Sequence, residues 1–365
     1  MQTMENRYAQ LLTQYCLDLR AGDQVYVRSS MLAEPLLREI WREGLKLGAN
    51  LIIDMDFPEK DNIFYAEANA DQLQWIDPGY AHAIKHFDAY LVIRAPYNLR
   101  DERVEEKDKL QMRKVATAPL NELYFSRTGS GSMRRTLCQY PTQAAAQEAD
   151  MTLSQYREFV TNACRLHDDD PGKSWLAVRE SQQHVVEYLN DCKHIQYVGP
   201  GTDVTFSVAG RLWMNSDGRA NMPSGEVFSA PIEDSVNGKV YFSYPSVYLG
   251  HPVQGITLWI KDGWVEQWEA EAGQEILDQV FSIEGARRFG EVAIGTNYNI
   301  QRPTRNILFD EKIGGSIHMA VGQSYYQCGG KNQSAIHLDM ITDMRQQGQI
   351  LADGKLIYEN GKFLI

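Results

Sequence analysis

The segment 308–339 reads LFDEKIGGSIHMAVGQSYYQCGGKNQSAIHLD, and the rest of the chain is expected to be organised around it. Among its glycines it carries five chemically active side chains: Glu311, His318, Tyr325, His337 and Asp339. His337 and Asp339 are two residues apart, so both lie on one face if the segment forms a β-strand. Carboxylate and imidazole groups together suit a borderline divalent cation. A single such histidine is more often an ordinary polar residue of a half-buried strand, but the set together predicts a metal site.

The composition is that of a globular protein with an acidic balance. The chain has 365 residues, of which 43% are hydrophobic and 23% charged, and its formal net charge is −12. This length is sufficient for two domains with cores of their own. Since phosphate backbones and anionic membranes are bound by basic patches, we expect no nucleic acid and no membrane as partners. A small molecule or a peptide is the expected partner.

The cysteines indicate a reducing compartment. They are odd in number, widely spread and never form a Cys-x-x-Cys pair, at positions 16, 138, 164, 192 and 328. Neither a disulfide framework nor a thiolate zinc site is therefore indicated. The N-terminal residues lack an apolar leader, and no run of about 18 apolar residues occurs. We expect a cytoplasmic protein that is neither exported nor inserted into a membrane.

The first half of the chain, residues 1–192, alternates helical and strand patterns. Apolar spacing predicts helices over residues 8–19, 34–47, 71–86, 152–167 and 175–189, and strands over 23–29, 50–55 and 89–93. Continuous apolar runs such as Ala89–Ile93 are typical of parallel strands covered on both faces. The glycine-rich turn of a nucleotide site is missing after the first strand. The mixed-sign residues 100–107 predict a solvated helix face, and the whole region predicts an open α/β domain.

The second half, residues 193–365, changes to β-branched and aromatic alternation. Four dipeptides there are typical of hairpin turns: Asn237-Gly238, Asp262-Gly263, Asp353-Gly354 and Asn360-Gly361. Short helices are predicted over 273–281 and 285–289. The expected fold class is therefore α/β, with an N-terminal open α/β domain at 1–192 followed by a β-rich α+β metal-binding domain at 193–365.

Three glutamates that stand near glycines extend the candidate metal site. They are Glu226, Glu291 and Glu311. A carboxylate inside an apolar strand is costly unless it faces a positive partner. A pair of divalent ions would supply that partner, because three glutamates, two histidines and one aspartate are enough ligands for two metals that share a bridging water.

Four segments resemble the signature segments of the M29 family, the metallopeptidases of the aminopeptidase T and aminopeptidase S type. These segments are Asn221–Phe228, Gly290–Glu291, Asp310–His318 and Ala335–Met340. They occur in the order of the family, and the resemblance extends over essentially the whole chain. It implies a dinuclear metal-dependent aminopeptidase, a homodimer, that acts on short peptides with a free N-terminus.

The resemblance also implies roles for individual residues. The implied metal ligands are Glu226, Glu291, Glu311, His318, His337 and Asp339, and they would hold two divalent ions. Zinc is the first expectation, with cobalt, manganese or magnesium as alternatives. The implied catalytic pair is Glu291 as general base and Tyr325 as donor to the oxyanion. Branches of the family differ in the spacing before the first histidine, so a direct metal contact of Glu311 stays open.

Two other functions are compatible with the same ligands. Relatives with a similar fold bind a single iron and open hydroxylated pyridine rings with oxygen, so His318, His337 and Asp339 alone would also fit a mononuclear iron dioxygenase. The carboxylates could instead hold a structural ion in a non-catalytic binding protein. The presence of Glu226, Glu291 and Glu311 together favours two hydrolytic metals.

Overall fold

The computed structural model describes residues 3–100, 106–248 and 250–365. The chain forms two compact units. The first contains Met1–Gly172 and Gly218–Pro223, and the second contains Lys173–Asp217 and Ser224–Ile365. The expected boundary at 192/193 thus lies about twenty residues beyond the first division, and the domain assignment stays a prediction. The helix face expected at residues 100–107 falls largely outside the described residues.

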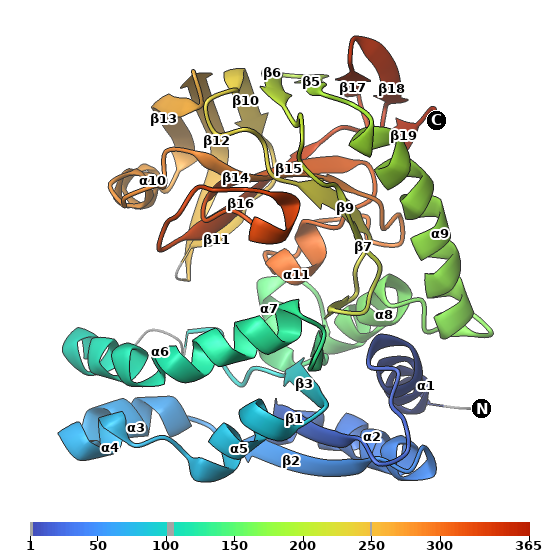
Figure 1. Cartoon of the computed structure of the whole chain (residues 1–365), viewed down its shortest axis with the longest axis vertical. Helices are drawn as coiled ribbons and strands as arrows, with labels where there is room; N and C mark the ends of the chain where they lie inside the picture. Colours follow the sequence, from blue (N-terminus) through green and yellow to red (C-terminus); the bar gives the residue numbers. More distant parts are fainter. Residues whose placement is uncertain (1–2, 101–105, 249) are drawn as a thin grey trace. The chain divides into compact units, whose positions relative to one another are not determined.

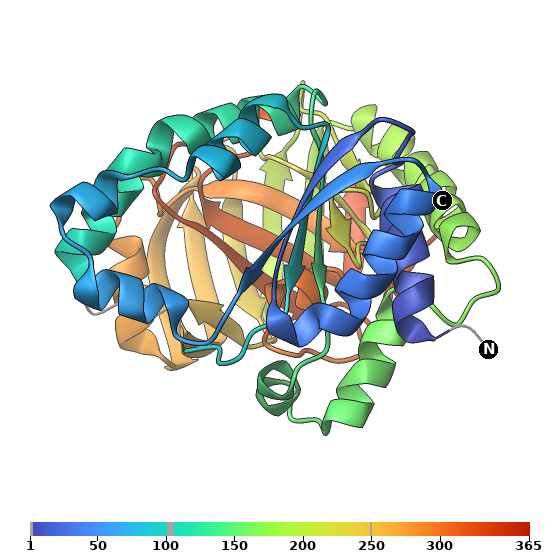
Figure 2. The same cartoon turned by 90° about the horizontal axis from the view of Figure 1, so that it is seen from below.

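The first unit is built on a parallel sheet of five strands, of which β1, β2 and β3 are labelled in Figure 1 and seen from below in Figure 2. Its order is β2-β1-β3-β4-β8, with the bounds Gln24–Ser30 for β1, Asn50–Asp56 for β2, Ala89–Arg94 for β3, Arg134–Gln139 for β4 and Asn221–Met222 for β8. Every neighbouring pair is parallel. Parallel neighbours require a crossover connection, which helices provide here. The expected strands of the first half are confirmed, and β4 and β8 are additional.

The helices of the first unit depart from the predicted pattern in several places. Their bounds are α1 Met4–Gln10, α2 Glu34–Lys46, α3 Lys60–Glu67, α4 Ala70–Gln74, α5 Pro78–His86, α6 Lys107–Gly129, α7 Gln143–Glu148 and α8 Leu153–Ala163. The single helix predicted over 71–86 is wrong. Pro78 starts a new helix, and the Asp77 side chain caps it by accepting bonds from the amides of Gly79 and Tyr80. The helices α3, α6 and α7 were not predicted. None of the described helices is long and apolar enough to cross a membrane.

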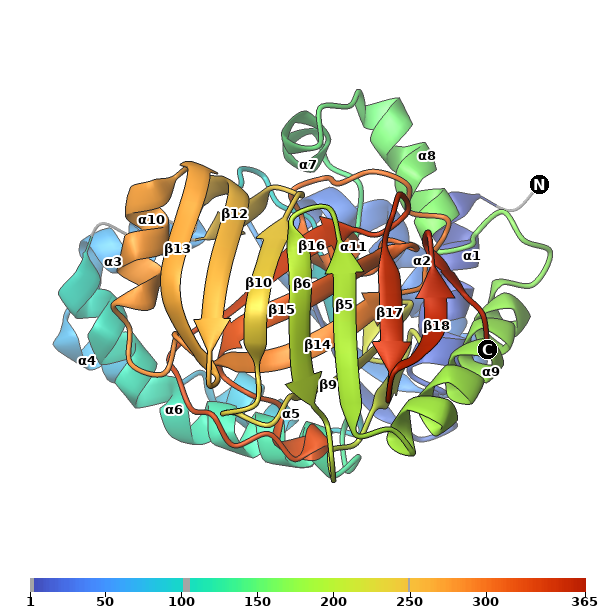
Figure 3. The ribbon, with the colours of Figure 1, turned by 90° about the horizontal axis from the view of Figure 1, so that it is seen from above.

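The second unit contains a large, mostly antiparallel sheet of nine strands (Figure 3). The order is β11-β12-β10-β6-β5-β17-β18-β19, with β13 paired to β12. The bounds are β5 His194–Gly199, β6 Thr202–Ser207, β10 Asn237–Phe242, β11 Ser246–Tyr248, β12 His251–Lys261, β13 Trp264–Ala272, β17 Gln349–Ala352, β18 Lys355–Glu359 and β19 Lys362–Phe363. The turns at Asp262-Gly263, Asp353-Gly354 and Asn360-Gly361 are confirmed, with positive φ at both residues. The turn predicted at Asn237-Gly238 is wrong, because both residues belong to β10.

A second antiparallel sheet packs against one face of the large sheet (Figure 3). Its order is β16-β15-β14-β9-β7, and the bounds are β7 Met214–Ser216, β9 Glu226–Ser229, β14 Phe289–Gly295, β15 Ser316–Gly322 and β16 His337–Asp343. One buried core joins the two sheets, with Tyr197 and Phe206 from the large sheet and Val292 and Met319 from the smaller one. The class is therefore mixed α/β, with one parallel sheet and two antiparallel ones.

Three helices complete the second unit, namely α9 Pro171–Asn190, α10 Gln274–Phe281 and α11 Ile307–Asp310. Val185, Val186 and Leu189 of α9 and Leu277 of α10 belong to the same core as the two sheets. The helix predicted over 285–289 is wrong, because residues 285–288 form turns and Phe289 already belongs to β14. Apolar residues at this position serve the sheet core and do not mark a helix face.

A charged network holds the end of β16, the strand that carries His337 and Asp339. The Arg345 backbone amide and Nε donate to Asp343 Oδ1, both at 2.9 Å, and the Tyr244 hydroxyl donates to Asp343 Oδ2 at 3.1 Å. Partial burial opposes the ionised form of Asp343, but the hydrogen bonds from Arg345 lower its pKa below the ordinary value. This end of the strand is thereby fixed next to the segment that contains Tyr244.

Asp343→Asn is expected to lower the free energy of unfolding by about 1 kcal/mol at pH 7, since the Arg345 side chain is 39% exposed and solvent weakens the pair. A lowered folded-state pKa contributes stability above the unfolded value, and this stability is lost as the pH falls through the folded value. The difference between wild type and variant should therefore begin to shrink near pH 4, the unfolded value, and disappear only at a more acidic pH. Urea unfolding at several pH values measures it. A difference that persists unchanged in acid would contradict this origin.

Candidate metal centre

The six predicted metal ligands come from four adjacent strands and one short helix end of the second unit. Glu226 begins β9, Glu291 lies in β14, His318 in β15, and His337 and Asp339 in β16; these strands are labelled in Figure 1. Alternation along a strand separates the two faces of the sheet. Val227, Val292, Ile317, Met319, Leu338 and Met340, which alternate with the ligands, all belong to the core between the sheets. The ligands consequently share the opposite face.

The ligands stand opposite small residues on neighbouring strands. Glu226 pairs with Gly295, and His318 pairs with Ala293. Ala320 lies between Glu291 on one side and Asp339 on the other, and His337 pairs with Gly322. Directly opposed Cβ atoms are only about 5 Å apart. A small residue opposite each ligand therefore leaves room above the sheet where an ion would be held.

Ala320→Leu is expected to weaken divalent-ion binding at least tenfold, because the added side chain would occupy the space between Glu291 and Asp339. Overpacking of this kind costs about 1–3 kcal/mol. Zinc titration of the metal-free protein measures the effect, and the exposed Ala272→Leu on β13 is the matched control. Unchanged zinc affinity in Ala320→Leu would show that no ion is bound in the space above Ala320, between Glu291 and Asp339.

Glu291 lies between the two histidines. Its Oε2 is 3.0 Å from His337 Nε2, and its Oε1 is 3.6 Å from His318 Nε2. Asp339 Oδ1 is 3.3 Å from His337 Nε2. Two groups of donors are close enough to hold an ion each, namely Glu291 with His337 and Asp339, and Glu311 with His318 and Asp339. Asp339 is common to both groups.

Glu311 and Glu226 meet a buried lysine. Glu311 follows α11 directly and is its C-terminal cap. The Lys312 ammonium contacts Glu311 and lies 3.6 Å from Glu226 Oε1. The other oxygen of Glu226, Oε2, is buried and accepts no hydrogen bond from any described residue, although His318 Nε2 is 3.6 Å away. Gly225 has a φ of +111° and a Cβ there would approach Asn297 to 2.7 Å, so only glycine lets β9 start at this place.

The charges of the site shift its pKa values strongly. Burial opposes the charged form of His318, yet Glu291 and Glu226 raise its pKa to about 9. Burial likewise opposes ionisation of Asp339, but His337 lowers its pKa to about 2. Burial raises the pKa of Glu311 to about 8, although Lys312 acts against this shift. The buried carboxyl groups of the site are thus stabilised by the positive charges beside them, a role that a bound cation would also fill.

Tyr325 stands at the edge of this group. It precedes a 3₁₀ turn at Tyr326–Cys328, and its ring centroid is 5.2 Å from those of both Phe228 and His337. The charge of Glu291, together with burial, raises the pKa of Tyr325 well above its ordinary value. Its hydroxyl therefore stays protonated and able to donate a hydrogen bond.

The residues fit a divalent metal. Three buried polar atoms of the group, Glu226 Oε2, His318 Nδ1 and Asp339 Oδ1, make no hydrogen bond within the described part of the chain. Buried polar groups in proteins are normally paired. His337 Nδ1 lies 2.8 Å from the carbonyl oxygen of Gln323, the kind of contact that fixes the ring of a metal ligand and turns Nε2 towards Glu291 and Asp339.

Sequence reasoning missed Lys312, Ala320 and Gln323. The rule that a buried carboxylate needs a positive partner pointed towards metals, but the same rule applies to the lysine beside Glu311. That adjacency was the signal that could have found Lys312. The roles of Ala320 and of the Gln323 carbonyl depend on strand register, which no local pattern shows.

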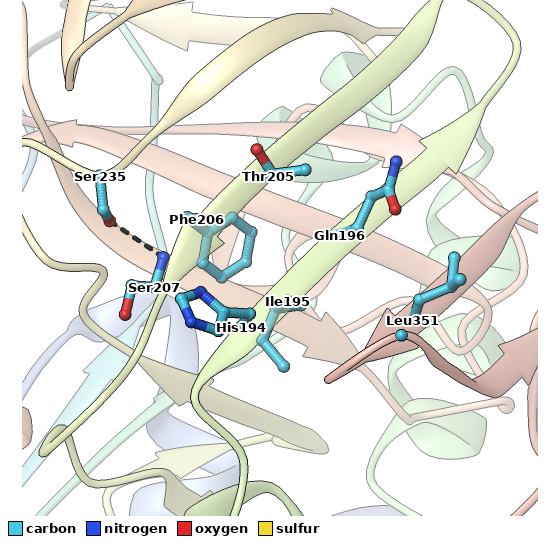
Figure 4. Close-up of a pocket in the computed structure, with 9 residues that line it drawn as sticks. His194, Ile195, Gln196, Thr205, Phe206, Ser207, Ser235 and Leu351 are labelled. Atoms are coloured by element: carbon cyan, nitrogen blue, oxygen red, sulfur yellow. Dashed lines mark hydrogen bonds between the residues drawn. The ribbon is translucent and has the colours of Figure 1, made fainter.

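A separate hollow of about 250 Å³ lies at the strands β5, β6 and β17 (Figure 4). Its described lining residues include His194, Gln196, Thr205 and Ser207. They contain one imidazole and no carboxylate, so they lack the donor set of the centre. We assign this hollow no part in the chemistry.

Comparisons with known proteins agree with the donor set. A family model described as "Thermophilic metalloprotease (M29)" matches residues 1–363. Aminopeptidase 2 of Geobacillus stearothermophilus is 27% identical over 96% of this chain and 94% of its own. Aminopeptidase T of Thermus thermophilus is 27% identical over 97% and 95%, and AmpS of Bacillus subtilis is 26% identical over 98% of both chains. The structure of wild-type AmpT from Thermus thermophilus shares the fold, with a TM-score of 0.84 at 23% identity over 99% of each chain.

Proposed function

Because the chain belongs to the M29 family of metallopeptidases, we propose that it is an aminopeptidase that removes N-terminal residues from short peptides with the help of two divalent ions. The observation that carries the proposal is the convergence of Glu226, Glu291, His318, His337 and Asp339 on one face of one sheet. The named relatives are aminopeptidases, and their similarity to this chain covers nearly their full lengths.

Two groups of residues would hold the ions. Glu291, His337 and Asp339 form the first group, and Glu311, His318 and Asp339 form the second, with Glu226 beside it. Zinc is the first expectation from the imidazole and carboxylate donors, and cobalt, manganese and magnesium remain alternatives. Such ions make water a nucleophile at neutral pH and polarise the scissile carbonyl.

Glu291 would act as the general base. Burial opposes its charged form, but hydrogen bonds from His318 and His337 lower its pKa, so the carboxylate is ionised at neutral pH. It can take a proton from the attacking water and return it to the leaving amine. A carboxylate held between two imidazoles cannot swing away, since both of its oxygens are engaged.

Tyr325 would stabilise the oxyanion that forms on the peptide carbonyl. Its hydroxyl is protonated, and its ring is packed between Phe228 and His337, which restricts where the hydroxyl can point. A donor fixed in advance costs no reorganisation when charge develops. A homodimer is also part of the proposal and rests on the resemblance alone, whereas the proposed cytoplasmic location rests on the cysteine pattern.

A panel of aminoacyl p-nitroanilides, assayed with zinc, cobalt, manganese or magnesium, tests the proposed function. Cleavage of the free-amine substrates is expected. The same substrates with an acetylated α-amine should be cleaved at least about 10²-fold more slowly, because the group of the protein that accepts a hydrogen bond from the free amine would be left unpaired. Equal cleavage of blocked and free substrates would contradict exopeptidase action. Absence of cleavage with every metal would contradict the proposal as a whole.

A further inference from the structure

Lys312 is the residue of the centre for which the proposed chemistry has no use. Its side chain is fully buried, and its ammonium contacts Glu311 and lies 3.6 Å from Glu226 Oε1. The backbone on either side is fixed, because the Lys312 amide donates to the Phe309 carbonyl at 3.1 Å and its carbonyl accepts from the Asn297 amide at 2.9 Å. The ammonium is therefore a permanent part of the site.

The lysine makes the two groups of donors unequal. It contacts Glu311, a member of the group with His318 and Asp339, and it approaches Glu226, which lies beside His318. No contact joins it to Glu291 or His337 among the described ion pairs, where those two residues pair with each other and with Asp339 or His318. The Glu311 group thus has a lysine ammonium beside its imidazole, whereas the Glu291 group has an imidazole alone.

We propose that Lys312 makes the Glu311 group the weaker ion site. The two divalent ions then bind in order, the first at the group that contains His337 and the second at the group that contains His318. This inference rests on the proposed dinuclear function. An ion in the Glu311 group competes with the ammonium for carboxylate oxygens and is repelled by its charge. Like charges a few ångströms apart repel strongly where little water screens them. The ammonium cannot withdraw, since a buried charge without its partner is costly.

Ordered loading has a consequence for metal dependence. At limiting metal concentration the protein should carry one ion per chain, held by Glu291, His337 and Asp339. The second ion should bind only at a higher concentration, so the metal concentration would set the fraction of complete centres.

Titration of the metal-free protein with zinc against a chromophoric chelator tests the inference. Wild type should show two classes of site whose dissociation constants differ at least about tenfold. In Lys312→Met, the weak class should tighten at least about tenfold while the tight class changes little. The exposed Lys261→Met on β12 removes the same charge elsewhere in the unit and should leave both classes unchanged.

Site assignment does not depend on whether Lys312→Met folds. With Lys312 in place, His318→Ala should remove the weak class and keep the tight one, and His337→Ala should remove the tight class. Two equal classes in wild type, an unchanged gap in folded Lys312→Met, or loss of the tight class in His318→Ala would each overturn the inference. Two classes of site with equal dissociation constants, in a protein with full peptidase activity, would overturn the ordered loading and leave the proposed function standing. Absence of any zinc binding would overturn the proposed function.

Discussion

Glu291→Gln is expected to lower kcat/KM on an aminoacyl p-nitroanilide by about 10²- to 10⁴-fold, the range for loss of a general base. Glutamine has nearly the shape of glutamate, so the contacts with His318 and His337 can largely persist, but an amide cannot accept the proton of the attacking water. The side chain is almost fully buried between the two rings, which leaves no space for solvent to replace it.

Three measurements separate this effect from damage to the centre. Zinc content and the circular dichroism spectrum of Glu291→Gln should stay close to those of wild type, so that the loss appears mainly in kcat. Glu266→Gln makes the same chemical change at an exposed position on β13 and should be fully active. Unchanged hydrolysis by Glu291→Gln would remove this residue from the catalytic step.

Tyr325→Phe is expected to lower kcat by about 10²- to 10³-fold, as the loss of one oxyanion donor does in other hydrolases. The phenyl ring can keep its contacts with Phe228 and His337, so only the hydroxyl is lost. KM should change little, because the donated bond strengthens only as charge develops on the carbonyl.

The neighbouring tyrosine offers a matched control for this experiment. Tyr326 is 63% exposed, against 38% for Tyr325, and only Tyr325 packs against His337. Tyr326→Phe should therefore keep nearly full activity. If Tyr326→Phe lost activity and Tyr325→Phe kept it, Tyr326 would be the oxyanion donor. If both variants were fully active, neither tyrosine would serve that role.

Much of the centre could be predicted from sequence because ligand identity and strand alternation are local properties. The two-residue step from His337 to Asp339 places both on one face, and the structure brings them together with Glu226, Glu291 and His318. Glu311 also lies in the group, although its contact with Lys312 could not be foreseen from its spacing to His318. Four segments far apart in sequence meet only through the pairing of β9, β14, β15 and β16.

Features that depend on register or on chain connectivity escaped prediction. The place of Ala320 between Glu291 and Asp339 follows from the pairing of three strands. The return of Gly218–Pro223 to the first unit, where β8 joins β4, is a long-range event with no local signal. By contrast, the break before Pro78 had a local signal in Asp77-Pro78, which the apolar spacing of the two flanking helices concealed.

Metal reconstitution tests the central claim most directly. The protein would be freed of metal with a chelator, loaded with zinc, cobalt, manganese, magnesium or ferrous iron in turn, and assayed for bound metal and for aminoacyl p-nitroanilide cleavage. The account predicts up to two divalent ions per chain, loss of activity on chelation, and its recovery with a hydrolytic metal such as zinc or cobalt. One iron per chain together with no peptidase activity under any loading would contradict it and favour a mononuclear oxygenase.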